Sequence, residues 1–409
     1  MMPEAGEPDF RLAIEYHQAG RLAEAQRAYR QVLAQQPNHA DALHLLGVLE
    51  LQAGRLDAAV EFIWRPISIC STNAIYYSNL GKALKDKGQP DQAIAACQQA
   101  IRLKPDFAEA YINLGTALVD IGHFDEAIVS GRQAIRLKPE FAEAHGNLGS
   151  VLMRIGQLDE AIAFLRQAIR LKPDLAVAHS NLVCVLQYHP GYDAKMIHEE
   201  LRRWNGQHAE PLKKLIQPHA NNRDPDRRLR IGYVSADFRD HVVGQNLLPL
   251  LREHDHREME IFCYSKLLQS DTLTDQLRSY ADVWRSIMGL SDSQAADLIR
   301  QDGIDILVDL ALHMADNRLA VFARKPAPYR RRTWAIAAAR AWMRWTTGCP
   351  IHTWTPRIRT WRASPPPCLF TASGQSGCRK PIGVTAFPAR LPSRRRRPRR
   401  RRDTSLSVA

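Results

Sequence analysis

The first half of the chain alternates apolar and polar positions in the manner of amphipathic helices, and this pattern recurs every 34 residues. A glycine marks the tight turn between the two helices of each copy. These glycines are Gly20, Gly54, Gly88, Gly122 and Gly156. Because one closed core cannot hold a fixed period over five copies, we expect a stack of like helix pairs, each burying its apolar face on the next.

Two other positions of the 34-residue unit carry characteristic residue types. Proline stands where the second helix must stop, because its ring has no N–H to continue the helical hydrogen bonds. These prolines are Pro37, Pro105, Pro139 and Pro173. Small residues recur where the two helices cross. They are Gly47, Gly81, Gly115 and Gly149 on first helices and Ala59, Ala93, Ala127 and Ala161 on second helices. This register resembles the tetratricopeptide repeat from about residue 8 to 177.

Asparagine occupies the same place in the first helix of four successive units, as Asn79, Asn113, Asn147 and Asn181. In tetratricopeptide superhelices the first helices line the inner face. One interpretation is that each amide caps or bridges neighbouring backbone. The other is that the amides bind the backbone of an extended acceptor peptide, because a side-chain amide offers both a donor and an acceptor. The second interpretation predicts a binder of many peptide sequences.

Short β-rich runs replace the repeats after residue 228. They cover residues 229–235, 260–265 and 305–310, and helical stretches such as 291–301 separate them. An amphipathic segment near 195 to 210 precedes them. Strands that alternate with helices predict a parallel sheet of the Rossmann kind. Ligands of such sheets bind beyond the carboxyl ends of the strands, so we expect the chemistry in the loops that follow the strands.

Two carboxylates and an imidazole follow the first strand, in the sequence SADFRDH at residues 235–241. One interpretation is an Asx-type turn or helix cap with an exposed histidine. The other is a charged cluster that orients or deprotonates a hydroxyl group. Composition alone favours the first.

Four segments resemble the first lobe of the SPINDLY/O-linked N-acetylglucosaminyltransferase (protein O-GlcNAc transferase) family. They read LRIGYVSADFRDH, IFCYS, DGIDILVDL and FARKPAP. The resemblance runs from about residue 8 to 329. It implies an α-solenoid, the tetratricopeptide superhelix, followed by the α/β Rossmann-like half of a two-lobed (GT-B type) glycosyltransferase. It also implies transfer of GlcNAc from UDP-GlcNAc to Ser or Thr hydroxyls of proteins, which bind in the asparagine-lined groove.

The family's D-F-x-x-H motif is matched by Asp237 and His241, which the resemblance implies as catalytic residues beside the acceptor hydroxyl and the sugar. His198, on the linking helix, is a weaker match to the family's other active-site histidine, and the alternative is a surface position on that helix. No metal ion is implied, and no cofactor beyond the donor substrate UDP-GlcNAc.

Four positions near this motif depart from the family pattern. Val242 and Gln245 replace a proline and a second histidine, while Leu312 and Met314 replace a glycine and a threonine. A bulky leucine where backbone or ligand comes close predicts a blocked pocket. These differences leave activity in question on the sequence alone.

The predicted organisation has four parts. About five tetratricopeptide repeats and a capping helix fill residues 8–188, a helical linker fills 189–228, and the transferase lobe fills 229–329. Residues 330–409 form a basic Pro/Arg-rich tail with no helical or strand period, for which we predict disorder. The tail carries 19 Lys and Arg against one acid, Asp403, whereas the preceding 329 residues carry 37 against 42. The net charge of +13 therefore originates in the tail.

The tail also admits an interpretation through the genetic code. Reading the codons of residues 333–356 in a shifted frame allows a string that resembles the family's continuation, so we hypothesise a frameshift between about 328 and 333. On this hypothesis the second lobe is absent and the chain is inactive as an enzyme, since preorganised charge stabilisation is usually the largest catalytic term. A genuine tail would instead offer Arg394–Arg402 to nucleic acid.

Two functions are therefore kept open, a protein O-GlcNAc transferase by descent and a non-catalytic tetratricopeptide scaffold for protein partners. The expected partners are acceptor proteins or peptides and a nucleotide sugar, with nucleic acid least expected. No run of 18 apolar residues and no export signal occurs, so we expect a cytoplasmic protein without a membrane partner. Seven scattered cysteines favour neither a disulfide framework nor a zinc site.

Overall fold

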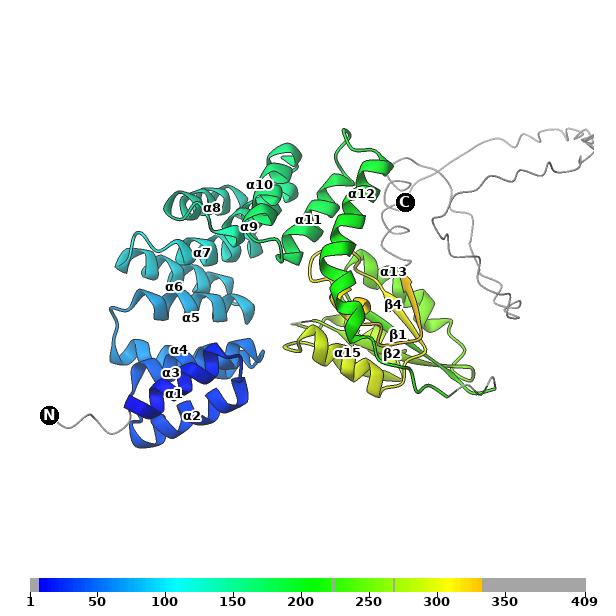
Figure 1. The fold of residues 1–409 in the computed structure, drawn as a ribbon, viewed down its shortest axis with the longest axis horizontal. Helices are drawn as coiled ribbons and strands as arrows, with labels where there is room; N and C mark the ends of the chain where they lie inside the picture. Colours follow the sequence, from blue (N-terminus) through cyan, green and yellow to red (C-terminus); the bar gives the residue numbers. More distant parts are fainter. Residues whose placement is uncertain (1–6, 223, 225, 268, 333–409) are drawn as a thin grey trace, which may run out of the picture. The chain divides into compact units, whose positions relative to one another are not determined.

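The computed structural model describes residues 7–222, 224, 226–267 and 269–332. Its first part is a run of antiparallel helix pairs that stack in sequence order, followed by a single capping helix (Figure 1). The pairs are α1 (Glu7–Gln18) with α2 (Leu22–Gln35), α3 (Ala40–Gln52) with α4 (Leu56–Ile69), α5 (Ala74–Asp86) with α6 (Pro90–Leu103), α7 (Ala108–Asp120) with α8 (Phe124–Leu137), and α9 (Ala142–Arg154) with α10 (Leu158–Leu171); α11 (Ala176–Leu186) follows. The predicted solenoid is confirmed.

The repeated glycines and prolines hold the places that the period predicts. The five turn glycines have φ between +72° and +81°, a left-handed conformation that side chains with a Cβ atom rarely adopt. Each of the four repeat prolines lies two residues after the end of a second helix, as Pro173 does after α10. At the helix crossing, a Cβ atom on Gly149 would lie 2.7 Å from Leu165 and 3.2 Å from the Ala161 carbonyl oxygen. The crossing therefore requires small residues.

A helical linker joins the solenoid to the sheet. It contains α12 (Ala194–Trp204), a π-helical turn (Asn205–Ala209) and a 3-10 turn (Glu210–Leu215). Its apolar side packs between the last solenoid helix and α16 (Leu319–Ala323). The shared core contains Val183, Trp204, Ala209, Leu319 and Ala323. The linker is therefore part of the packed structure on both sides.

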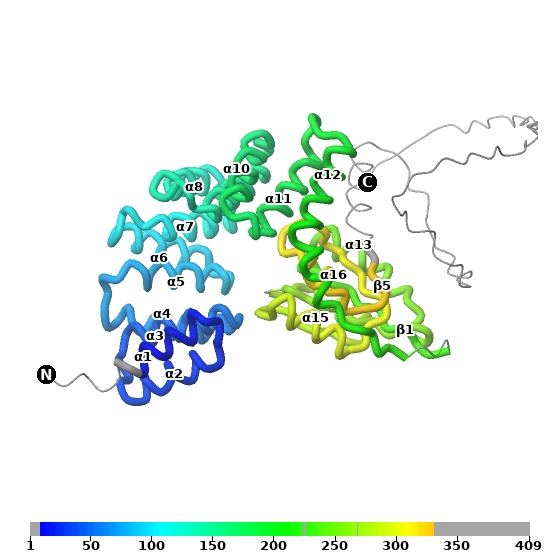
Figure 2. Tube along the Cα trace, viewed as in Figure 1, coloured from blue at the N-terminus to red at the C-terminus, as the bar shows by residue number. Residues whose placement is uncertain are grey.

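The second part is a five-stranded, fully parallel sheet with the order β3-β2-β1-β4-β5. Its strands are β1 (Leu229–Ser235), β2 (Met259–Ser265), β3 (Val283–Ser286), β4 (Ile306–Asp309) and β5 (Tyr329–Arg332). In the tube view β5 follows α16 and lies at the end of the described chain (Figure 2). This order is that of the Rossmann fold, with the strand order reversing between β1 and β4. The predicted Rossmann-like half is confirmed.

Helices cover both faces of the sheet and divide its core in two. On one face α15 (Asp292–Gln301) and α16 pack on Phe262, Tyr264 and Leu307. On the other face α13 (Val242–Arg252) and α14 (Thr272–Ser279) pack on Ile231 and Ile261. Alternate residues of β1 enter the two cores, as a strand with a side-chain period of two requires.

Three of these strands were predicted from the sequence, whereas β3 and β5 were not. The β3 strand has only four residues and two of them, Arg285 and Ser286, are exposed, so it lacks the apolar run that marked the others. The β5 strand (YRRR) is basic and begins at Tyr329, across the boundary expected at 329/330. The predicted tail from residue 333 onward lies outside the described residues. Among the helices of the described part, none is long and apolar enough to span a membrane.

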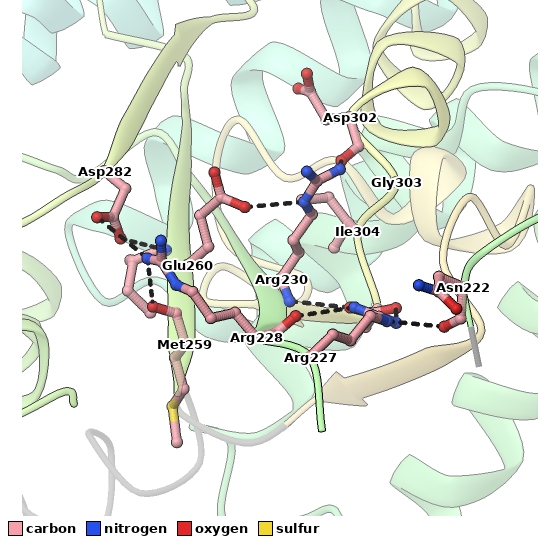
Figure 3. Close-up of polar contacts among 12 residues, drawn as sticks. Asn222, Arg227, Arg228, Arg230, Met259, Glu260, Asp282, Asp302, Gly303 and Ile304 are labelled. Atoms are coloured by element: carbon pink, nitrogen blue, oxygen red, sulfur yellow. Dashed lines mark hydrogen bonds and ion pairs between the residues drawn. The ribbon is translucent and has the colours of Figure 1, made fainter. Parts of the chain in front are cut away.

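A charged cluster at the amino ends of the strands anchors the end of the linker to the sheet (Figure 3). The buried Asp305 carboxylate accepts from both terminal nitrogens of Arg227, at 2.5 and 2.7 Å, and from the Arg230 backbone N–H at 2.9 Å. Asn221 donates to it at 2.8 Å. Burial acts against ionisation, but these donors hold the pKa of the Asp305 carboxyl below its ordinary value. One carboxylate therefore joins linker, β1 and β4.

Candidate functional site

A polar cavity of about 580 Å³ lies at the carboxyl ends of β1, β2 and β4. The loops after these strands and two solenoid residues line it. The lining residues are Gly88, Arg154, Ala236, Asp237, Arg239, His241, Lys266, Leu267, Gln269, Met314, Ala315 and Asp316. The expectation that the chemistry follows the strand ends agrees with this position, which is the usual ligand site of doubly wound sheets.

Asp237 and His241, the predicted catalytic pair, both line this cavity. The Asp237 carboxylate is largely buried, and its Oδ2 lies 3.8 Å from His241 Nδ1, too far for a hydrogen bond. His241 is the N-cap of α13, where its Nδ1 accepts from the Val243 N–H at 3.2 Å. The helix-cap interpretation is therefore observed together with the position in the cavity.

The cap fixes the tautomer of His241. Because Nδ1 accepts a hydrogen bond, the neutral ring carries its proton on Nε2 and can donate from there to a ligand. To act as a base through Nε2, the ring would need the other tautomer, with its proton on Nδ1. That tautomer would lose the hydrogen bond from the Val243 N–H and would point the Nδ1 proton toward Asp237. The arrangement thus supports orientation of a hydroxyl or sugar oxygen by His241 more directly than removal of its proton.

Neighbouring loops hold the Asp237 loop in place. Asp271, the N-cap of α14, accepts from the Asp240 backbone N–H at 2.6 Å and from Thr274. Hydrogen bonds from these backbone groups lower the pKa of the Asp271 carboxyl. A Cβ atom on Gly244 would lie 2.3 Å from the Arg239 carbonyl oxygen, so α13 begins in direct contact with the loop. The loop is positioned by hydrogen bonds and close packing together.

The loop after β4 contains two residues in the left-handed region, Leu312 at φ +48° and Asp316 at φ +58°. This conformation costs a residue with a Cβ atom about 1–2 kcal/mol. The buried Asp309 supports the loop by accepting from the N–H groups of Ala311 and Leu312. Leu312, which stands where the family has glycine, therefore adopts a glycine-like conformation and does not line the cavity; Met314 lines it instead.

His198, the third predicted catalytic residue, does not lie at this cavity. It is exposed on α12 and is absent from the cavity lining. This position agrees with the alternative of a surface helix residue. The proposed catalytic role of His198 has no geometric support in the described residues.

Other histidines of the same region form a buried network that was not predicted from the sequence. His179 donates from Nε2 to Glu200 at 2.9 Å, and its Nδ1 lies 3.1 Å from Nε2 of His208. The hydrogen bond from His179 lowers the pKa of the Glu200 carboxyl, while burial lowers the pKa of His208. These residues are distant in sequence, so only the folded chain brings them together.

A second set of contacts links this network to the cavity loop. Ser180 accepts from the Trp204 indole N–H at 3.0 Å, and its hydroxyl lies 3.3 Å from Nδ1 of His313. The His313 ring also packs edge-on against Trp204, with ring centroids 4.9 Å apart. Because His313 precedes Met314, these contacts tie the loop after β4 to the last solenoid helix.

The four asparagines lie half-buried on α5, α7, α9 and α11. Asn113 donates from Nδ2 to Ser78 of the preceding unit, Asn181 donates to Ser150 at 2.7 Å, and Asn79 Nδ2 lies 2.8 Å from His44 Nε2. Amides therefore do bridge neighbouring units, as one interpretation predicted. These bonds use the nitrogen and leave the side-chain oxygen for a ligand.

A second cavity of about 460 Å³ lies at the opposite, amino end of the strands. Arg228 and Arg230 line it, but each already contacts a carboxylate, Asp282 at 3.6 Å and Glu260 at 2.9 Å respectively (Figure 3). Its positive charges are thus compensated within the fold. Across the described part of the chain, no group of three His, Cys, Asp or Glu side chains is placed to hold a metal ion.

Comparison with known families defines the class of protein. Residues 207–336 match glycosyl transferase family 41. Residues 10–63, 74–107 and 112–176 match tetratricopeptide repeats. The solenoid with a Rossmann-like lobe is thus a tetratricopeptide array joined to a glycosyltransferase domain.

Individual relatives narrow this class. The chain is 34% identical over 142 residues to the probable UDP-N-acetylglucosamine–peptide N-acetylglucosaminyltransferase SPINDLY of Petunia hybrida. This match covers 34% of this chain and 15% of the relative. It is 37% identical over 112 residues to the SPINDLY protein of Arabidopsis thaliana. That match covers 26% of this chain and 12% of the relative. In both its repeats and its transferase segment the chain is therefore similar to O-GlcNAc transferases.

A solved structure agrees with this assignment. A mutant O-GlcNAc transferase of Thermobaculum terrenum is 38% identical and matches with a TM-score of 0.59. The match covers 64% of this chain and 50% of that chain. The chain thus spans half the length of this solved relative and a smaller share of the plant relatives. The family match ends at residue 336, beyond the predicted lobe limit of 329, and the predicted domain limits stay predictions.

Proposed function

We propose that the solenoid binds acceptor polypeptide and presents a Ser or Thr hydroxyl to a sugar-transfer site at the carboxyl ends of the strands. The donor in this proposal is UDP-GlcNAc, the substrate named for the plant relatives. The observation that carries it is a polar cavity lined by Asp237 and His241 from the lobe and by Arg154 from the solenoid. Acceptor and donor could meet there.

The asparagines supply the acceptor-binding part of this proposal. The nitrogens of Asn79, Asn113 and Asn181 bond to neighbouring units, so their oxygens would accept from the backbone N–H groups of an extended peptide. Such contacts do not depend on peptide side chains. Asn147 is the most informative position, because its side chain makes no hydrogen bond to another described residue.

Peptide binding tests this part directly. A fluorescently labelled, Ser-containing peptide is titrated with the full chain, and its anisotropy gives the dissociation constant. Asn147→Ala should weaken binding about fivefold, the effect of one lost hydrogen bond. The control is Gln98→Ala, which removes an exposed amide from the second helix α6. Equal effects of both substitutions, or no binding by the wild type, would contradict the proposal.

Transfer itself is tested with UDP-GlcNAc and the same peptide, followed by mass spectrometry. Met314 lines the cavity where the family has threonine, and we therefore expect peptide binding with little or no transfer. Transfer that disappears in Asp237→Ala would show that the cavity is catalytically competent. Peptide binding without any transfer would favour the alternative of a non-catalytic scaffold, for which Met314 in the cavity is the supporting observation. The cytoplasmic location stays a prediction from the sequence.

A further inference from the structure

An ion pair joins the loops on either side of the first strand at the cavity. Lys266 follows β2 directly, and its Nζ donates to the Asp316 carboxylate, in the loop after β4, at 2.5 Å. Both residues line the cavity. Because β1 lies between β2 and β4 in the sheet, the pair spans the carboxyl end of β1. It therefore bridges the two sides of the loop that contains Asp237.

The two partners of this pair are held to different degrees. The Lys266 backbone N–H donates to the Ser235 carbonyl oxygen at 3.0 Å, which fixes the residue at the end of β1, and its side chain is 27% exposed. The Asp316 side chain is 61% exposed and belongs to a loop residue with φ +58°. Aspartate adopts this left-handed conformation more readily than most residues. Lys266 is thus the fixed partner, and Asp316 is the partner that can turn away into solvent.

The charges that the lobe contributes to the cavity balance only because Asp316 is among them. The cations are Arg239 and Lys266, and the anions are Asp237 and Asp316. Arg239 lies 3.5 Å from Asp237, so these two charges offset each other. When Asp316 turns away, Lys266 is left as a partly buried ammonium group that faces the cavity. The lobe's part of the cavity then has an excess positive charge.

Three other charges act on the Asp316 carboxylate from beyond ion-pair distance. Lys85 and Arg318 attract it, and Asp120 repels it. The carboxylate therefore keeps cations nearby when it leaves Lys266. Its release costs less than the loss of an isolated pair would, because these cations partly replace the one it leaves.

We infer that Lys266 binds a phosphate group of an anionic ligand in this cavity, and that the Asp316 carboxylate competes with that group for the same ammonium. The inference rests on the proposed function, in which a nucleotide sugar brings a diphosphate to this cavity. Carboxylate and phosphate oxygens both accept charge-assisted hydrogen bonds from an ammonium group. Asp316 is thus a built-in competitor that weakens the binding of anions at Lys266.

Pyrophosphate is the probe for the test, because it carries the diphosphate without the nucleoside or the sugar. Isothermal titration calorimetry of the full chain measures its dissociation constant. Asp316→Asn should tighten pyrophosphate binding about threefold to fivefold, the range of a partly exposed ion pair. Lys266→Met keeps most of the side-chain length without the charge. It should weaken binding, and the double variant should show none of the gain.

The matched control is Asp297→Asn on α15, a helix that contributes no residue to the cavity lining. Asp297 pairs with Arg300 at 2.6 Å, and the side chains are 52% and 21% exposed, so the control breaks a similar pair with the same charge change. It should leave the dissociation constant unchanged. An equal gain in Asp297→Asn would attribute the effect to net charge and overturn the inference.

Three further results would also overturn the inference. They are absence of pyrophosphate binding by Asp316→Asn, a gain that persists in the double variant, and a gain with a phosphoserine peptide but none with pyrophosphate. The last result would assign Lys266 to the acceptor instead of the donor. Peptide binding by the asparagines is measured separately, so a failure here is distinguishable from a failure of the proposed function.

Discussion

The solenoid and the lobe are held together by different kinds of contact. In the solenoid each unit repeats the same contacts with its neighbours, such as the crossing at Gly149. In the lobe, one buried carboxylate at Asp305 holds together segments that lie about eighty residues apart. Stability is thus distributed in the first region and concentrated in the second.

The sharpest test of this contrast is Asp305→Ala. It leaves the Arg227 guanidinium and the Arg230 backbone N–H without their acceptor, and breaking a buried ion pair in this way costs about 3–5 kcal/mol. We expect faster hydrogen exchange in β1, β4 and the linker. Amides of α3 to α8 should exchange as in the wild type.

The control for this test is Glu143→Ala, which breaks an exposed ion pair with Lys172 in the solenoid. Exposed pairs contribute less than about 1 kcal/mol, so hydrogen exchange should barely change in either region. If Asp305→Ala also loosened the solenoid, the two regions would form one cooperative unit and the comparison would fail.

A second test concerns pH and the solenoid alone. Burial lowers the pKa of His44 from 6.5 to about 4, so its Nε2 stays unprotonated and available to Asn79. Between pH 6.5 and 4 His44 is protonated in the unfolded chain but not in the folded one. The free energy of unfolding therefore has its full value above pH 6.5 and decreases as the pH drops toward 4. The loss should reach at most about 3 kcal/mol. Urea unfolding of the wild type and His44→Gln across this window measures it, and equal pH slopes would contradict the assignment.

The smallest effects come from two glycines at equivalent crossings. Gly149→Ala places a Cβ atom 2.7 Å from Leu165 and should destabilise the solenoid by about 1–3 kcal/mol. Gly115→Ala meets only the Ala127 carbonyl oxygen at 3.4 Å and Ser130 at 3.7 Å, so it should gain up to about 1 kcal/mol of helix propensity. Thermal melts of the two variants should shift in opposite directions. Shifts of the same sign would show that crossing distance does not govern this position.

Much of the solenoid could be predicted from its sequence because the period reports contacts between neighbours. Gly54, for example, marks a left-handed turn that the pattern alone locates. In the lobe, β1 was predicted to the residue, since its apolar run is continuous. The short, half-exposed β3 has no such run, and only its pairing with β2 defines it as a strand.

The site was only partly accessible to sequence reasoning. Asp237 and His241 could be identified because one loop contains both. Lys266 and Arg154 could not, because they reach the cavity from a different loop and from the solenoid. His198 was carried over on a weaker resemblance that does not say which way the helix faces, and its catalytic role stays a prediction.

The left-handed glycine turns have a consequence for how this protein can change over evolutionary time. Because Gly20 to Gly156 recur at one φ and one spacing, duplication or excision of a whole unit would rejoin the chain at an equivalent turn. For the units that begin at α5, α7 and α9, each such event would change the array by one asparagine and keep the asparagines in phase. The length of the array therefore changes only by whole units, and recombination can alter it without any change in the lobe.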